Sequence, residues 1–357
     1  MHAEERQQAI LRRVREGGSI RVTDFAAELG VSPVTMRKDV EVLAERGLVA
    51  RVHGGAMLPE DWAETAPAAS AVPAQGGRPR AMGLIVPSAS YYYPEVIKGA
   101  REAAAARGVR LTLGVSEYHG EVEQAQARQM IEDGAEGLLL VPSETAGAAG
   151  RAWYEELDVP VVLIERRPEH DVAGAEHVGT DHAYGARLAV QHLLGMGRRR
   201  VALLIRSSTP TSPWIREGYS GGLRAAGLDG PDAATVIDLP GESPADPDHG
   251  RRMEEFLDAV EDGRIDAAIV HPDNEALVLL RRLRARSLSV PGDVALVSYD
   301  DEVAALADIP LSAVAPSKHE VGAAAVELLA LRLAEPGRPR RRVAILPELR
   351  VRSSSTS

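Results

Sequence analysis

From residue 81 onward, short apolar runs alternate with amphipathic stretches, and this alternation limits the possible folds of the chain more than any other feature. The runs MGLIV at 82–86, GLLLV at 137–141 and PVVLI at 160–164 are apolar throughout. Strands that are apolar on both faces belong to parallel sheets that helices cover on both sides. The pattern predicts an α/β fold with two lobes, each built on a doubly wound parallel sheet.

The first 58 residues carry helical periodicity instead. An amphipathic stretch at 4–16, a short strand at 19–22 and a helix that Thr23 caps and Gly30 ends come first. A third helix follows, for which Ser32 is a suitable N-cap, and then a basic strand that ends in a Gly-Gly turn. Helices joined by a turn and followed by a two-stranded wing are typical of a winged helix-turn-helix.

The third helix is predicted to have one buried face and one face rich in donors. Met36, Val40 and Leu43 recur at helical spacing and should lie in a core. The other face and the wing offer side chains suited to phosphates and base edges. The spacing alone is equally typical of an ordinary surface helix followed by a hairpin. The candidate DNA contacts are Ser32, Thr35, Arg37, Lys38, Arg51 and His53.

Charge and composition exclude several classes of protein. The chain has no Cys, which excludes disulfides, a Cys nucleophile and thiolate metal sites. Its net charge of −11 argues against binding nucleic acid over the whole surface, but residues 1–58 hold nine basic and eight acidic side chains. No stretch resembles a signal peptide or approaches the ~20 apolar residues of a membrane span. We therefore expect a cytoplasmic protein.

The order of these patterns predicts the domain boundaries. Residues 1–58 form the winged helix-turn-helix, and 59–80, rich in Ala, Pro, Gly and Ser, form a linker. The two-lobed domain spans 81–352 and a tail spans 353–357. Its first lobe is predicted to contain about 81–178 and 302–342, and its second lobe about 179–301 and 343–352.

Two known families resemble different parts of the chain. The stretch RQQAILRRVREGGSIRVTDFAAELGVSPVTMRKDVEVLAERGLVARVHGGA, at 6–56, closely resembles the DNA-binding domain of the DeoR family of bacterial repressors. The motifs SYYYPEVIKGAREAAAARG, VGTDHAYGARLAVQHLL and SVPGDVALVSYDD resemble the effector domain of LacI/GalR repressors, which shares the fold of periplasmic sugar-binding proteins. DeoR proteins usually carry a different domain after the wing, and LacI proteins usually begin with a different head and a hinge helix.

Ligands of such domains bind beyond the carboxyl ends of the strands. Aromatic faces suit a sugar ring, carboxylates accept its hydroxyl groups, and arginine donates in a rigid fork. The tyrosines could also simply anchor their own loop. The candidate ligand contacts at these strand ends are Tyr91, Tyr92, Tyr93, Glu165, Arg166, Trp214, Arg216, Asp273 and Asp300.

The resemblance ranks these ligand contacts. Arg216 and Asp300 match the positions that grip the ligand in the LacI family, and Asp273 matches a family Asp. Pro272 stands where the family often has Asn, and Pro316 stands where the LacI repressor has a polar contact. These departures mean that the ligand cannot be copied from any one relative.

Catalytic and metal patterns have little support. Residues 218–222 (GYSGG) fit the G-x-S-x-G motif, but the residues before them indicate a helix rather than the strand that a nucleophile elbow needs. His177 and His182 are not at i, i+4, and no nucleotide-phosphate loop stands at a strand–helix junction. We predict no catalytic residue, no metal and no cofactor.

Together these patterns predict a DNA-binding transcription regulator, and we expect it to act as a repressor. It would bind operator DNA as a homodimer and a sugar-like effector between its lobes, without a membrane partner. The alternative is a sugar-binding protein or a sugar-active enzyme without regulatory DNA binding.

Overall fold

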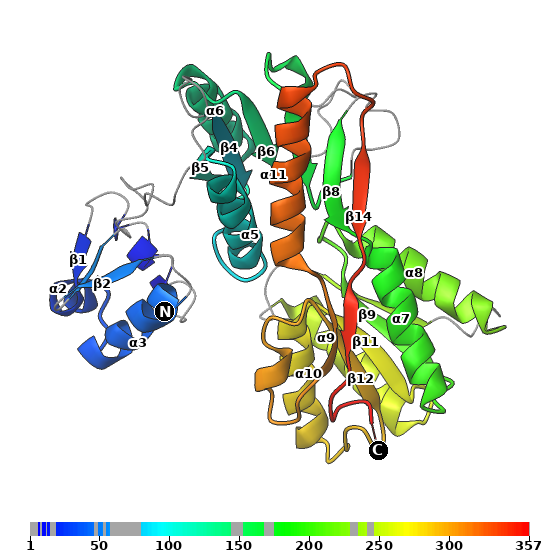
Figure 1. Cartoon of the computed structure of the whole chain (residues 1–357). Coiled ribbons are helices and arrows are strands. Elements are labelled where there is room, and N and C mark those ends of the chain that lie inside the picture. Colours follow the sequence, from blue (N-terminus) through cyan, green and yellow to red (C-terminus); the bar gives the residue numbers. More distant parts are fainter. Residues whose placement is uncertain are drawn as a thin grey trace. The chain divides into compact units, whose positions relative to one another are not determined.

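The chain divides into two compact units, Met1–Arg78 and Pro79–Ser357, which are described separately. The computed structural model (Figure 1) describes residues 6–7, 9–11, 13–14, 19–45, 49–52, 55–57, 80–143, 153–167, 175–228, 235–240 and 246–356.

The smaller unit is a winged helix-turn-helix, as the sequence predicts. The described residues of 6–14 are helical, and a three-stranded antiparallel sheet has the order β1-β3-β2. Met36, Val40 and Leu43 are buried against Ile10 and Phe25, which confirms the predicted core face of the third helix. The elements are β1 (Ser19–Arg21), α2 (Val22–Glu28), α3 (Pro33–Glu45), β2 (Ala50–Val52) and β3 (Gly55–Met57).

The first lobe of the larger unit is a six-stranded parallel sheet in the order β14-β8-β7-β6-β4-β5. Two helices, α5 and α11, pack on one face of this sheet, and α6 packs with a 3₁₀ turn on the other. The elements are β4 (Ala81–Val86), α5 (Tyr93–Ala106), β5 (Arg110–Val115), α6 (Gly120–Glu132), β6 (Gly137–Leu140), η1 (Trp153–Glu156), β7 (Val161–Ile164), β8 (Glu176–Thr180), α11 (Lys318–Ala334) and β14 (Arg342–Ile345).

The second lobe is a six-stranded sheet in the order β10-β9-β11-β12-β13-β15, in which only β15 is antiparallel to its neighbour. Helices α7 and α8 cover one face, and α9 and α10 cover the other. The elements are α7 (His182–Gly195), β9 (Val201–Arg206), α8 (Ser212–Ala225), β10 (Thr235–Leu239), α9 (Pro247–Glu261), β11 (Ala267–His271), α10 (Asp273–Ala285), β12 (Ala295–Tyr299), η2 (Ala304–Leu306), β13 (Ser312–Ala315) and β15 (Glu348–Arg350). The predicted α/β fold with two mostly parallel sheets is confirmed.

The chain passes between the lobes three times, after β8, after β13 and after β14 (Figure 1). Because β13 pairs with β12, the chain returns to the first lobe after residue 315, whereas the sequence placed this return near 302. The last residues also differ from a free tail, since Ser354 and Ser355 are buried in the second lobe.

Helices α5 and α11 lie unusually close together because glycine stands at their contact. A Cβ atom built on Gly99 would lie 1.9 Å from the carbonyl oxygen of His319, and one on Gly322 would lie 2.0 Å from that of Val96. The two glycines therefore allow the helix backbones to touch. This contact places the first residue of α11, Lys318, between the lobes.

Candidate functional sites

The carboxyl ends of strands from both lobes meet at the interlobe boundary, and their polar side chains bond to one another. Tyr91, which follows β4 in the first lobe, donates its hydroxyl to Asp300 Oδ2 in the second lobe at 3.1 Å. Tyr92 donates to Glu165 Oε1 at 2.6 Å. We call Tyr91, Tyr92, Glu165, Thr180, His182, Asp300, Glu302 and Lys318 the interlobe cluster.

Glu165 is the most fully bonded carboxylate of the interlobe cluster. It accepts hydrogen bonds from the Thr180 amide at 3.0 Å and from the Thr180 hydroxyl at 2.8 Å, and His182 Nε2 lies 3.4 Å from its Oε2. Burial opposes ionisation of Glu165, but the adjacent His182 and the hydrogen bonds from Tyr92 and Thr180 outweigh it and hold its pKa at about 2. Glu165 therefore stays ionised as an acceptor at the boundary.

Lys318 joins the lobes from the other side. Its ammonium group lies 2.5 Å from Glu302 Oε1, bonds to the Asp300 carbonyl oxygen, and stands 5.2 Å from the centre of the Tyr92 ring. Burial raises the pKa of Asp300, and the nearby Lys318 charge only partly offsets this effect. Asp300 is thus a buried acid that a ligand hydroxyl could reach by replacing Tyr91.

The backbone at this boundary is strained. Among the described residues other than glycine, seven have a positive φ angle, and they include Tyr91 (55°), Glu165 (55°), Asp300 (95°) and Asp301 (55°). Such conformations are costly for side chains with a Cβ atom and concentrate at binding sites, where the surrounding structure maintains them. The strain orients three of the predicted ligand contacts across one boundary.

Asp273 is the first residue of α10 and lies two residues beyond the end of β11 in the second lobe. Its Oδ2 accepts hydrogen bonds from the backbone amides of Glu302 at 2.6 Å and Val303 at 3.1 Å. Its Oδ1 is buried and has no hydrogen-bond partner in the part of the chain that the structure describes. Burial, with the Asp300 charge beside it, raises the pKa of Asp273 to about 6.

The remaining predicted ligand contacts have other neighbours. Arg216 pairs with Asp238 on β10. The Trp214 ring is covered by the guanidinium of Arg167, 4.4 Å from the ring centre, so this pair also spans the two lobes. The other two predicted contacts, Arg166 and Tyr93, are buried.

Arg166 and Tyr93 lie inside the first lobe. The Nε of Arg166 donates to the Pro142 carbonyl at 3.1 Å, and the side chain is buried. Tyr93 is buried in the apolar cluster beneath α5. The structure therefore brings Tyr91, Tyr92, Glu165 and Asp300 together and sets Arg166 and Tyr93 behind them.

Four members of the interlobe cluster were missed in the sequence, namely Thr180, His182, Glu302 and Lys318. His182 and Lys318 are each the first residue of a helix at a point where the chain passes between the lobes. These crossings, like the other predicted contacts, directly follow the carboxyl ends of strands. His182 lies two residues beyond β8 and Lys318 three residues beyond β13, so an extension of the strand-end rule to three residues includes both.

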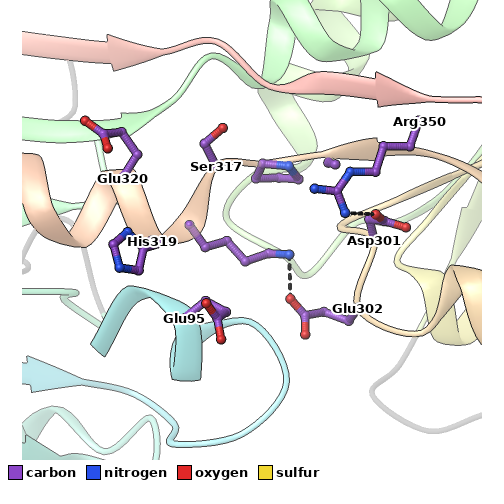
Figure 2. Close-up of a pocket in the computed structure, with 10 residues that line it drawn as sticks. Glu95, Asp301, Glu302, Ser317, His319, Glu320 and Arg350 are labelled. Atoms are coloured by element: carbon purple, nitrogen blue, oxygen red, sulfur yellow. Dashed lines mark hydrogen bonds and ion pairs between the residues drawn. The ribbon is translucent and has the colours of Figure 1, made fainter. Parts of the chain in front are cut away.

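A surface pocket of about 440 Å³ adjoins the interlobe cluster (Figure 2). Glu302 and Lys318, joined by their ion pair, belong to both, while Asp301 and Arg350 form a second ion pair on its wall. The other lining residues include Glu95, His319 and Glu320.

The candidate DNA contacts on α3 lie on one exposed stretch of that helix. Ser32 caps α3, since its hydroxyl accepts a hydrogen bond from the Thr35 amide at 3.1 Å. Arg37 and Lys38 are exposed, whereas Asp39 faces inward and pairs with Arg6 at 2.7 Å. The backbone of Arg51 lies in β2, and His53 falls outside the described residues.

Within the described ranges, no three His, Cys, Asp or Glu side chains are grouped so as to hold a metal ion. None of the helices in those same ranges is long and apolar enough to cross a membrane.

Comparisons with known proteins account for both units. Residues 6–61 match the DeoR-like helix-turn-helix domain, and residues 190–355 match the periplasmic binding protein-like domain. The arabinose metabolism transcriptional repressor of Geobacillus stearothermophilus is 25% identical over 320 residues, covering 86% of this chain and 82% of the relative. The ribose operon repressor of Escherichia coli (strain K12) is 26% identical over 277 residues, covering 76% of this chain and 81% of the relative.

Solved structures agree with these relatives. The transcriptional regulator CelR in complex with cellobiose is similar with a TM-score of 0.65 and 25% identity, over 91% of each chain. A LacI family regulator of Enterococcus faecium with bound ribose shares the fold, with a TM-score of 0.63 at 18% identity over 78% of this chain and 99% of that one. The relatives are repressors, not enzymes. The chain therefore joins a DeoR-like helix-turn-helix domain to a periplasmic-binding-protein-like effector domain of the LacI type, and it is a DNA-binding transcription regulator.

Proposed function

We propose that this protein is a cytoplasmic repressor that binds operator DNA as a homodimer and releases it when a sugar binds between the two lobes. The observation that carries the proposal is the interlobe cluster, in which Tyr91 and Glu165 of the first lobe face Asp300 and His182 of the second. A ligand that bonds to both sides changes how the lobes are held together.

The chemistry of the cluster suits a polyhydroxyl ligand. Carboxylates such as Glu165 and Asp300 accept hydroxyl groups, while tyrosine rings present apolar faces with a polar end. Trp214, on the first turn of α8, contacts Arg167 of the first lobe, and Arg216 lies two residues further along the same helix. The names of the relatives support the same class, because they are regulators of arabinose or ribose genes or complexes with cellobiose.

The DNA end of the proposal rests on α3 and the wing. Within the proposed boundaries of 1–58 for the head and 59–80 for the linker, Thr35, Arg37 and Lys38 would enter the major groove, with Arg51 and His53 of the wing at the backbone. Two heads in a symmetric dimer would read two half-sites. Ligand and operator must then change each other's affinity by the same factor.

The test is a footprint on the DNA upstream of the gene for this protein, with and without D-ribose, L-arabinose and cellobiose. We expect salt-sensitive, sequence-specific protection that a binding sugar weakens, and a dimer by light scattering. Arg37→Ala should cost about 1–3 kcal/mol in operator binding and leave sugar binding intact. Asp300→Ala should do the reverse.

One outcome contradicts the proposal, and a second identifies a folding defect in the variants. Absence of specific protection, with sugar binding retained, would favour a sugar-binding protein without regulatory DNA binding. Equal loss of both functions in Arg37→Ala and Asp300→Ala would indicate misfolding instead, so the melting temperature of each variant is measured in parallel.

A further inference from the structure

A buried set of charged residues lies in the second lobe, next to the interlobe cluster but outside it. Arg206, the last residue of β9, pairs with Glu275 Oε1, and Glu275 Oε2 lies 2.8 Å from His249 Nε2. The side chains of Glu275 and His249 are each 1% exposed, and that of Arg206 is 21% exposed. The trio therefore points from the core toward the carboxyl end of the sheet.

Such a trio is a poor way to stabilise a core. Removing charges from water costs several kcal/mol for each ion, and well-packed apolar residues often stabilise a protein as well or better. Glu275 in particular stands on the face of α10 that otherwise packs with Ala276, Leu279 and Leu283. A buried charge at a place where an apolar residue would fit suggests that it holds another group in position.

The group held in position is the Arg206 guanidinium, which bonds to Glu275 through one of its nitrogens but not through Nε. Its Nε is buried without a hydrogen-bond partner in the described part of the chain, and so are His271 Nδ1 and Asp273 Oδ1. β9 and β11 are neighbours, with Ile205 paired to His271, so Arg206 and His271 end adjacent strands about 4.8 Å apart. Three unsatisfied polar atoms therefore gather at the strand ends that face the first lobe.

Native structures rarely leave buried polar atoms without partners, and a cluster of them at a binding edge indicates a ligand. Asp300 completes the row, since it follows β12 beside β11 and its Oδ2 lies 3.8 Å from His271 Nε2. The row thus runs over three adjacent strands of the second lobe.

The charges of the row indicate what the ligand carries. Glu275 offsets the charge of Arg206. Burial lowers the pKa of His271 to about 3, so its ring is a neutral donor and acceptor. Asp273 and Asp300 stand beside them, and a carboxylate or phosphate on the ligand would be repelled there. Donors and acceptors without free positive charge suit hydroxyl groups.

We propose that Arg206 and His271 form, with Asp273, the second-lobe half of the ligand site, that Glu275 and His249 position Arg206 there, and that the group bound is an uncharged polyhydroxyl rather than a sugar acid or sugar phosphate. This inference rests on the proposed function and deepens it, because neither Arg206 nor His271 was among the predicted ligand contacts.

The experiment measures binding by calorimetry and melting temperature for the full chain. The probes are D-ribose, L-arabinose and cellobiose, each beside its aldonate, with ribose 5-phosphate added. Arg206→Lys keeps the charge opposite Glu275 but removes Nε–H, and we expect it to weaken binding of the neutral sugar roughly tenfold without a large loss of melting temperature. Arg264→Lys is the matched control, because Arg264 is exposed and pairs only with the neighbouring Asp262 among the described residues.

A second variant distinguishes positioning from simple structural support. Glu275→Gln keeps hydrogen bonds to Arg206 and His249 but leaves the arginine charge without an offset. We expect weaker binding of the neutral sugar and stronger binding of its aldonate, by several-fold in each direction. A merely structural Glu275 would lower the melting temperature and leave this preference unchanged.

The results separate the inference from the proposed function. Unchanged sugar affinity in Arg206→Lys, or a wild-type preference for an aldonate or phosphate, would overturn the inference while leaving a ligand-binding regulator. If no probe of any class binds the wild-type protein, the sugar-responsive function itself fails, and the assignment of Arg206 and His271 fails with it.

Discussion

Removal of the last four residues should destabilise the second lobe, although the sequence there reads as a polar tail. The backbone of Ser354 accepts a hydrogen bond from the Leu296 amide and donates one to the Pro310 carbonyl. Its hydroxyl donates to the Leu296 carbonyl at 2.7 Å and accepts from the Ser312 amide at 2.8 Å. The Ser355 hydroxyl bonds to the Ser312 hydroxyl at 2.6 Å and to His192 Nε2 at 2.7 Å. Residues 354 and 355 therefore connect α7, β12 and β13 through hydrogen bonds.

The magnitude follows from these bonds. Six hydrogen bonds at about 1 kcal/mol each would amount to about 6 kcal/mol, and water that reaches the freed groups reduces the loss to about 4 kcal/mol. For a domain of this size the melting temperature should fall by about 10 °C. Ligand affinity should fall too, because β12 leads to Asp300 and β13 leads to Lys318.

The assay compares urea unfolding of wild type with chains that end at 353 and at 355. The chain ending at 355 keeps Ser354 and Ser355 and should lose less than about 1 kcal/mol, since only one described hydrogen bond, from Thr356 Oγ1, is removed. If the chain ending at 353 unfolds within about 1 kcal/mol of wild type, or if both truncations cost the same, Ser354 and Ser355 do not hold the second lobe together.

Three further predictions test other parts of the structure. The pKa of Asp273 is raised to about 6 in the folded protein, so the fold is stabilised while this carboxyl is protonated and loses that stabilisation as pH rises from about 4 to 6. Asp273→Asn lacks this titration. Urea titrations should therefore show its stability relative to wild type increasing by about 3 kcal/mol between about pH 3.5 and 7. Gly99→Ala should cost at least ~2 kcal/mol, because its Cβ would meet the His319 carbonyl at 1.9 Å; calorimetric melting measures this. Arg167→Ala should change the fluorescence of Trp214 and its response to ligand.

The fold was largely predictable because its signals are local. The strand predicted at 82–86 is β4 at 81–86, and the cap at Ser32 and the core face of α3 follow from residue type and spacing. The sequence-based boundary near 302 differs because β13, SAVA, contains only one β-branched residue and gives a weak strand pattern. Its place between β12 and β15 depends on pairing across the sheet, which the local sequence does not display.

The site was predictable only to the level of strand ends. That rule identified Tyr91, Glu165 and Asp300, which the structure does bring together. It did not distinguish them from Tyr93, which belongs to the same loop but turns into the apolar core at the start of α5. The difference arises from positive φ angles at the strand ends, and these are imposed by the surrounding structure rather than by residue type.

At the proposed interlobe site, ligand binding has to be an exchange of bonds rather than an addition of bonds. Tyr91 already bonds to Asp300, His182 faces Glu165, and Lys318 bonds to Glu302, each pair joining the two lobes. A ligand that takes over these groups gains only the difference between the old and new bonds. It nevertheless changes which contacts hold the lobes together, and a differential interaction of this kind is what shifts a conformational equilibrium. In the proposed regulator, the same cluster limits the affinity for the ligand and signals that the ligand is bound.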